Sequence, residues 1–173
     1  MAGSERLRTD RGDKQLYTPE QRRRRDASPW TLVQGILAPV QFAAFLISVG
    51  LILRYLVTGD GLAAANWSIV VKTGLLYTIM ITGSIWEKVV FGHWLFAEAF
   101  FWEDMVSMLV LALHTAYLIC LFEGLLNPVE LMILALAAYA TYVVNAAQFI
   151  IKLRAARLGA RHLPVATDRL EVV

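Results

Sequence analysis

The chain has 173 residues, of which 58% are apolar and only 17% are charged, with a formal net charge of +2. Soluble domains usually carry about 45–50% apolar and about 25% charged residues. This composition argues against an ordinary soluble enzyme, a disordered chain and a nucleic-acid-binding domain. It indicates an integral membrane protein of one domain.

The first 28 residues form a basic segment that we expect to be cytoplasmic and mostly disordered. Eight of the 16 lysines and arginines precede Trp30, among them Arg22–Arg25. An export signal does not explain them, because no small-residue cleavage site follows and the next apolar run is too long for a signal peptide. An orientation anchor on anionic lipid is the preferred interpretation.

Four apolar stretches follow, each close to the ~20 residues that a helix needs to cross the hydrocarbon core. Because the stretches are continuous rather than alternating, we expect helices and not the strands of a barrel. The predicted fold is an all-α integral membrane four-helix bundle over residues 29–157, followed by a cytoplasmic tail over residues 158–173. The predicted spans lie at 31–56, 67–87, 103–122 and 129–152.

The distribution of lysine and arginine predicts the orientation of the bundle. The N-terminal segment has eight such residues, the loop 87–102 has one and the chain from Lys152 onward has five. The loops 58–66 and 123–130 have none. Both termini and the middle loop are therefore predicted to be cytoplasmic.

Three carboxyl groups are predicted to meet near the cytoplasmic end of the bundle. Glu87 ends the second span, and Glu103 and Asp104 begin the third. Polar groups are costly in a bilayer, so a cluster at one depth favours a functional site over helix packing. Solvated helix ends are the alternative for each carboxyl group taken singly. The other polar side chains expected near this depth are those of Gln34, Tyr142, Asn145 and Gln148.

His114 lies in the middle of the third span, on the same helical stripe as Glu103. The two residues are about 16 Å apart along the helix axis, so both can face one elongated cavity without touching. A hydrogen-bonded core histidine and an axial ligand to a tetrapyrrole metal are both open interpretations.

Other polar residues in the spans have simpler explanations. A set of polar residues recurs every seven residues on one face of the first span, which favours interhelical hydrogen bonds over a ligand role. The set is Gln34, Gln41, Ser48 and Tyr55. Arg54 and Lys72 lie toward the outer ends of their spans, and we expect both to snorkel to the head groups.

The segment from Trp86 to Trp102 holds seven of the chain's 19 aromatic residues, with His93 among them. A segment of this kind lies in the membrane interface or covers a flat apolar ligand, and its composition fits both interpretations. We therefore expect an aromatic-rich interfacial segment between the second and third spans.

Several longer motifs are distinctive as a set. They are LYTPEQRRRRDASPWTLVQG at 16–35, LAPVQF at 37–42, TGSIWEKVVFG at 82–92, AFFWED at 99–104, LALHT at 111–115 and AAYATYVVNAAQF at 137–149. The pattern resembles the 2-vinyl bacteriochlorophyllide hydratase family of bacteriochlorophyll biosynthesis, over about residues 16–157.

The resemblance implies a hydro-lyase that adds water to the ring-A (C3) vinyl group of chlorophyllide a or 3-vinyl bacteriochlorophyllide a. The product would carry a 1-hydroxyethyl group. The resemblance also implies a multi-pass protein of the bacterial inner membrane, cytoplasmic or intracytoplasmic photosynthetic, with other pigment-biosynthesis enzymes as possible partners. No cofactor and no metal site are expected beyond the magnesium of the substrate itself.

Roles for single residues follow from the chemistry of hydration. The reaction needs an acid to protonate the vinyl group and a second group to position or deprotonate water. Glu103 is the expected acid, with Glu87 or Asp104 orienting the water. His114, or else His93, is the candidate ligand to the substrate's magnesium. The expected pigment or water contacts also include Gln34, Trp86, Trp102, Tyr142, Asn145 and Gln148.

A non-enzymatic tetrapyrrole-binding protein, acting as a carrier, an assembly factor or a haem protein, is the alternative. A bis-histidine haem would need two mid-span histidines, and only His114 is in such a place. A proton-coupled transporter would spread ionisable groups through the whole membrane, whereas the fourth span has none.

Overall fold

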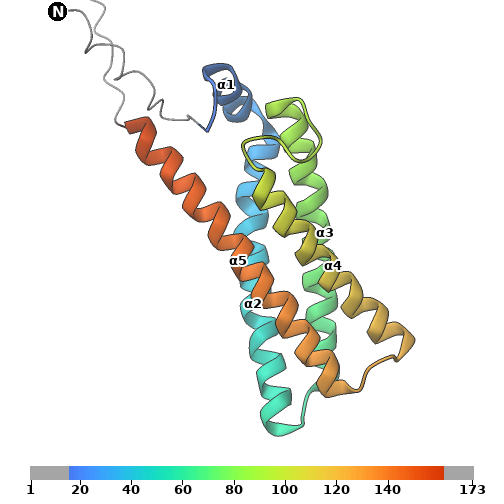
Figure 1. Ribbon diagram of the computed structural model, residues 1–173. Coiled ribbons are helices and arrows are strands. Elements are labelled where there is room, and N and C mark those ends of the chain that lie inside the picture. Colours follow the sequence, from blue (N-terminus) through green and yellow to red (C-terminus); the bar gives the residue numbers. More distant parts are fainter. Residues whose placement is uncertain (1–15, 162–173) are drawn as a thin grey trace, which may run out of the picture.

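The computed structural model describes residues 16–161, and all regular secondary structure within this range is α-helical (Figure 1). Its helices are α1 (Pro19–Ala27), α2 (Pro29–Thr58), α3 (Leu62–Phe91), α4 (Phe101–Glu123) and α5 (Pro128–Arg161). Helices α2 to α5 contain 30, 30, 23 and 34 residues, so each is long and apolar enough to cross a membrane. The prediction of an all-α protein with four membrane-capable helices is confirmed.

Each predicted span lies inside one helix, but every helix is longer than its predicted span. The largest difference is in α5, which continues to Arg161 instead of ending near residue 152. The tail predicted for residues 158–173 therefore begins as helix, and residues 162–173 lie outside the described part of the chain.

Helix α1 shows that Pro19–Ala27 of the basic segment are helical, while residues 1–15, the larger part of the segment expected to be mostly disordered, lie outside the described range. Thr18 and Gln21 form a capping box: the Gln21 amide donates to the Thr18 hydroxyl at 3.2 Å, and the Thr18 amide donates to the Gln21 side chain at 2.9 Å. Pro19 occupies the first turn, where its missing N–H costs nothing. This start signal lets a strongly charged segment fold as helix.

The bundle is built from two helical hairpins, α2–α3 and α4–α5. Gly59 and Gly61, with φ of 77° and 89°, supply the left-handed backbone of the first turn. Asn127 starts α5 by accepting hydrogen bonds from the amides of Val129 and Glu130, both at 3.0 Å. The second hairpin crosses the first obliquely, and contacts between the hairpins are fewer than contacts within them (Figure 1).

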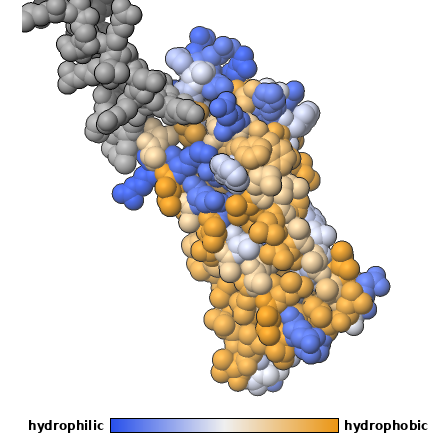
Figure 2. All heavy atoms as spheres, viewed as in Figure 1, coloured by the Kyte–Doolittle hydropathy of each residue, from blue (hydrophilic) through white to orange (hydrophobic). Residues whose placement is uncertain are grey.

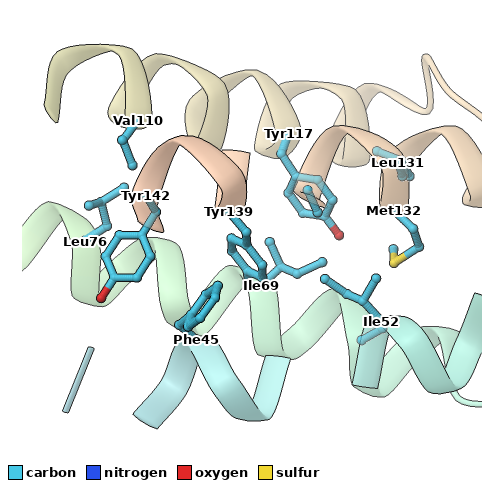
Figure 3. Packing of buried hydrophobic residues seen from close by; sticks show 12 residues of the cluster. Phe45, Ile52, Ile69, Leu76, Val110, Tyr117, Leu131, Met132, Tyr139 and Tyr142 are labelled. Atoms are coloured by element: carbon cyan, nitrogen blue, oxygen red, sulfur yellow. The ribbon is translucent and has the colours of Figure 1, made fainter. Parts of the chain in front are cut away.

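An apolar core fills the region where the hairpins cross (Figure 3). Phe45 of α2 packs edge-on against Tyr139 of α5, with ring centroids 5.3 Å apart. Ile52, Tyr117 and Met132 are fully buried in the same cluster. Close van der Waals packing of this kind is a main source of helix association in a membrane.

The face of the bundle seen in Figure 2 is apolar along most of its length. Hydrophilic residues gather at the end that carries α1, which also holds the α3–α4 loop and the end of α5 (Figures 1 and 2). We call it the α1 end. Trp102 at the α1 end and Trp67 near the opposite end are 71% and 69% exposed, as expected for tryptophans at two membrane interfaces.

Candidate active site

Two carboxyl groups meet at the α1 end of the bundle. Glu87, one turn before the end of α3, and Asp104, in the first turn of α4, are only 5% and 4% exposed, and neither forms an ion pair with a described cation. Two carboxyl groups that are buried close together without a cation favour a state in which one of them carries a proton. We call Glu87 and Asp104 the acid pair.

The loop between α3 and α4 folds back over the acid pair. The Phe96 amide donates to Asp104 Oδ2 at 2.8 Å, and the Ala97 amide donates to Glu87 Oε2 at 3.2 Å. Phe96 has a φ of 58°, the one positive φ outside glycine among the described residues. Such a backbone costs about 1–3 kcal/mol and is typical of functional sites. The aromatic-rich loop therefore holds both carboxyl groups in place, and its position in the membrane interface stays a prediction.

The third carboxyl group, that of Glu103, points to a different helix. Its Oε2 accepts a hydrogen bond from Lys152 Nζ of α5 at 2.6 Å, and the same ammonium lies 5.1 Å from the centre of the Phe100 ring. An ion pair of this kind stabilises the ionised carboxylate. Lys152 was not among the residues predicted for the site, because it was counted with the basic tail. Lys152 lies seven residues after Asn145, so the two residues share one face of α5, and this spacing could have predicted its place in the site.

Two amides lie on the same side of α5 as Lys152. Asn145 Nδ2 donates to Ser107 Oγ of α4 at 2.7 Å. Asn145 Oδ1 and Gln148 Oε1 are buried without a hydrogen-bond partner among the described residues. The structure thus brings Glu103, Ser107, Asn145 and Lys152 together along the contact between α4 and α5.

A second polar group lies in the middle of the bundle and corrects the expectation for Lys72. Its side chain does not snorkel: it is fully buried, donates to Gln41 Oε1 of α2 and lies 3.9 Å from the centre of the Tyr142 ring of α5. These partners come from other helices and hold the ammonium inside. His114 is also fully buried, with Nδ1 2.8 Å from the Val110 carbonyl oxygen.

Interhelical hydrogen bonds are present for three of the four residues of α2 expected to form them, and the side chain of the fourth, Tyr55, forms none with a described residue. Gln34 Nε2 donates to Thr82 Oγ1 of α3 at 2.7 Å, Gln41 accepts from Lys72, and Ser48 lies 2.8 Å from Ser68 Oγ. Gln34 is thereby engaged with Thr82 and makes no hydrogen bond to the acid pair.

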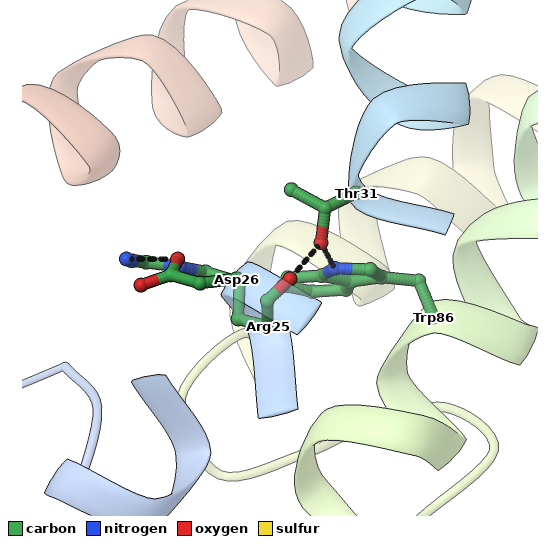
Figure 4. Close-up of polar contacts among 4 residues, drawn as sticks. All are labelled: Arg25, Asp26, Thr31 and Trp86. Atoms are coloured by element: carbon green, nitrogen blue, oxygen red, sulfur yellow. Dashed lines mark hydrogen bonds and ion pairs between the residues drawn. The ribbon is translucent and has the colours of Figure 1, made fainter. Parts of the chain in front are cut away.

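Three predicted pigment contacts lie outside this polar region. The Trp86 indole donates to Thr31 Oγ1 at 2.9 Å, and that hydroxyl donates to the Arg25 carbonyl oxygen at 2.6 Å, so Trp86 ties α1 to the bundle (Figure 4). Trp102 is largely exposed, and His93 is exposed in the loop.

Tyr17 is a further residue that sequence reasoning missed. Its ring stacks on Phe91 with centroids 5.7 Å apart, and the Arg25 guanidinium lies 4.7 Å from the ring centre. Burial raises the pKa of the Tyr17 phenol, so the group stays protonated at neutral pH. Tyr17 closes the aromatic cluster beside Phe100 at the α1 end.

An apolar hollow of about 340 Å³ lies at the other end of the bundle. Its one amide, Asn66, already accepts a hydrogen bond from the Tyr117 hydroxyl at 2.8 Å, and no ionisable side chain lines the hollow. The hollow therefore offers space for an acyl chain but no acid or base. The lining residues are Ala63, Asn66, Trp67, Val70, Leu121 and Phe122.

Comparison with known proteins gives a consistent result. Residues 17–155 match the sequence model of the family described as 2-vinyl bacteriochlorophyllide hydratase (BCHF). A relative of that name from Cereibacter sphaeroides is 67% identical over 145 residues, covering 84% of this chain and 90% of its own. Another from Rhodobacter capsulatus is 65% identical over 147 residues, covering 85% of each chain. No solved structure matches the chain.

Proposed function

Because this chain belongs to the 2-vinyl bacteriochlorophyllide hydratase family, we infer that it is a hydratase acting on the vinyl group of such a pigment in bacteriochlorophyll biosynthesis. Identity of 65–67% over most of both chains supports this inference. We further propose chlorophyllide a or 3-vinyl bacteriochlorophyllide a as substrate, with a 1-hydroxyethyl pigment as product. The proposed setting is the bacterial inner membrane, with the α1 end on the cytoplasmic side.

The reaction has three chemical steps. A proton adds to the terminal vinyl carbon, which becomes a methyl group, and the adjacent carbon becomes a cation that the macrocycle delocalises. The oxygen of a water molecule forms a bond to that carbon. The bound water then loses one proton, so the pigment gains one water in total. The enzyme must supply an acid, a base and a position for water.

We assign the proton donor to the acid pair, Glu87 and Asp104. The observation that carries this assignment is the burial of both carboxyl groups. They accept hydrogen bonds from two successive loop amides and form no ion pair with a described cation, which favours one shared proton over two charges. Glu103, the acid expected from the sequence, is bonded to Lys152 and so is better suited as a carboxylate. In this assignment, Glu103 accepts the proton that the added water releases, and the amides of Phe96 and Ala97 orient the acid pair.

Exposed aromatic rings beside the acid pair offer a binding surface for the pigment. Trp94, Phe96 and Trp102 are 59%, 40% and 71% exposed, and all three belong to the loop over the acid pair or to the adjoining turn of α4. Exposed aromatic rings present a flat apolar surface to a macrocycle. We propose that the pigment lies there with its vinyl group toward Glu87 and Asp104.

The two histidines differ in their access to the substrate's magnesium. His93 is exposed in the loop and can reach a pigment at the surface. His114 Nε2 has no partner among the described residues, so its chemistry also fits an axial ligand. The ring is fully buried beside Tyr139, however, and ligation there requires α4 and α5 to separate. Loss of the pigment's absorbance shift in His93→Ala but not in His114→Ala would favour the surface position.

The experiment that tests the function uses membranes of a host without chlorophyll enzymes. Membranes with and without this chain are incubated with chlorophyllide a, and the pigment mass is followed for the gain of one water. Hydrated pigment only where the chain is present supports the proposal. Pigment that binds with unchanged mass, for both proposed substrates, would instead identify a carrier or assembly protein.

Isosteric variants test the acid pair in the same assay. We expect Glu87→Gln and Asp104→Asn to lower the hydration rate by about 10²–10⁴-fold, the usual contribution of a general acid, while pigment still binds. Glu98→Gln, an exposed carboxyl in the same loop, is the matched control and should keep full activity. Full activity in both acid-pair variants would remove the pair as the proton donor.

A further inference from the structure

A cationic side chain beside the acid pair has no role in the mechanism assigned above. Lys88 directly follows Glu87 in α3, and it is the one lysine or arginine in the segment 87–102. Its side chain is exposed and forms no ion pair with a described carboxylate. Three other cations of the α1 end are already paired with carboxylates, namely Arg24, Arg25 and Lys152. The charge of Lys88 is therefore open to a partner from outside the chain.

The ammonium of Lys88 is directed toward the loop that covers the acid pair. Its Nζ donates a hydrogen bond to the Gly92 carbonyl oxygen at 2.8 Å and lies 5.9 Å from the centre of the Trp94 ring. Gly92, with a φ of 86°, supplies the left-handed backbone at which α3 ends and the loop begins. Ser84, one turn before Lys88, donates a hydrogen bond to the Trp94 carbonyl oxygen. These contacts hold Lys88 and Trp94 side by side.

Capping of its own helix leaves the Lys88 ammonium with room for a second partner. A lysine in the last turn of a helix commonly bonds the terminal carbonyl groups, which is the simplest role for Lys88. An ammonium has three donors, however, and the bond to Gly92 occupies one of them. Trp94 is 59% exposed despite its contact with Lys88, so most of the ring is open. A cation beside an open aromatic ring suits a flat aromatic ligand that carries a carboxylate.

The substrates proposed above are molecules of this kind. Chlorophyllide a and 3-vinyl bacteriochlorophyllide a carry a free propionate on ring D, the ring next to the one that bears the vinyl group. In the proposed function the vinyl group points toward Glu87 and Asp104, and Lys88 is the next residue after Glu87. A pigment that lies on Trp94 with its vinyl group toward the acid pair therefore keeps its propionate on the surface that Lys88 borders.

We propose that Lys88 and Trp94 form a subsite that orients the pigment. The Trp94 ring stacks on the macrocycle, and the Lys88 ammonium pairs with the propionate carboxylate. This pairing gives the protein a preference for a free-acid pigment over an ester of the same macrocycle. Lys88 takes no part in the proton transfers and is a binding residue that determines specificity. The identity of the ligand rests on the proposed function, but recognition of its carboxylate can be measured without turnover.

Two pigments that differ only in one ester group test the subsite. Chlorophyllide a and its methyl ester share the vinyl group, the magnesium and the macrocycle, and the free acid alone has the negative charge. Both are hydrated by the full chain in membranes, and KM is measured for each. Lys88→Met should raise KM for the free acid about 5-fold, as loss of an exposed ion pair predicts, and leave KM for the ester unchanged. An unchanged ratio of the two KM values in this variant would overturn the proposal.

Three further variants separate recognition of the charge from other effects. Lys88→Arg keeps the cation and should keep the wild-type ratio of the two KM values. Arg154→Met removes a positive charge from another exposed side chain at the α1 end and should also keep that ratio. Trp94→Leu removes the stacking ring and should raise KM for both pigments by a similar factor. Equal changes of the ratio in Lys88→Met and Arg154→Met would show that net charge attracts the acid, which would overturn the assignment to Lys88.

Binding measurements distinguish failure of the subsite from failure of the proposed function. Quenching of tryptophan fluorescence by each pigment gives its Kd without turnover. A preference for the free acid that Lys88→Met abolishes, in a chain that hydrates neither pigment, would support the subsite while the proposed function fails. Hydration of both pigments, with a Kd ratio that Lys88→Met does not change, would support the function and overturn the subsite.

Discussion

The buried carboxyl groups at the α1 end have different partners, and in the proposed mechanism this difference sets their chemistry. Glu87 and Asp104 accept hydrogen bonds from loop amides, whereas Glu103 pairs with the ammonium of Lys152. A shared proton suits an acid, and an ion-paired carboxylate suits a base. In the proposed mechanism, Glu87 and Asp104 therefore supply the acid and Glu103 supplies the base, although all three are carboxyl groups at the same end of the bundle.

Lys152 is expected to act through Glu103 as a positioning residue. Lys152→Met should lower kcat with little change in KM, because the carboxylate loses the group that holds it in place. Lys152→Arg keeps the charge and the hydrogen bond and should retain most of the activity. Steady-state kinetics of both variants decide the matter, and equal kcat in wild type and Lys152→Met would exclude this role.

The Lys72–Gln41 contact makes a prediction about stability. Lys72→Met alone leaves the Gln41 oxygen buried without a donor, which should lower the free energy of unfolding by about 1–3 kcal/mol. Adding Gln41→Leu removes both partners and should restore most of that loss. The free energies of unfolding of the wild type, the single variants and the double variant, measured in mixed micelles, complete this double-mutant cycle. Additive losses in the double variant would show that the two side chains are not coupled.

At the scale of elements, the stability of α1 depends on the hydrogen bonds that cap its first turn. Thr18→Ala removes the hydroxyl that caps Gln21, which costs about 1 kcal/mol of helix stability. Amide hydrogens of residues 19–27 should then exchange faster, while those of α2 are unchanged. Thr18→Ser keeps the cap and is the matched control. Equal exchange in both variants would mean that packing of Tyr17 and Trp86, not the cap, holds α1.

The sequence was most informative about features that depend on one helix. Uninterrupted apolar runs predict the four spans, because length and hydropathy are properties of a single segment. The seven-residue spacing of Gln34, Gln41 and Ser48 predicts their interhelical bonds for the same reason. The capping box at Thr18 was equally readable, yet the charge of the segment led to an expectation of disorder.

Features that depend on several elements were missed. Lys72 looks like a snorkelling residue until Gln41 and Tyr142, from two other helices, are placed around it. The amides of Phe96 and Ala97 have no side-chain signature, since any residue supplies an N–H and only the loop conformation aims it. Tertiary contacts of this kind follow from the packing of elements and not from local pattern.

For the whole molecule, the orientation in the membrane is the main prediction. The basic helix α1 and the described end of α5 lie at one end of the bundle, so both should face the cytoplasm (Figure 1). In a Cys120→Ser background, a membrane-impermeant maleimide added to spheroplasts should label Asp60→Cys but not Glu20→Cys. The reverse labelling would invert the bundle and place the acid pair on the periplasmic side.

The division into two hairpins also has a consequence for biogenesis. A ribosome releases α2 and α3 before α4 and α5, so the first hairpin enters the bilayer with Lys72 bonded to Gln41 alone. The Tyr142 ring that covers the ammonium belongs to the last helix to be synthesised. Until that helix is inserted, we expect the ammonium to lack this cover, and insertion of the nascent chain to depend on the insertion machinery between its second and fourth spans.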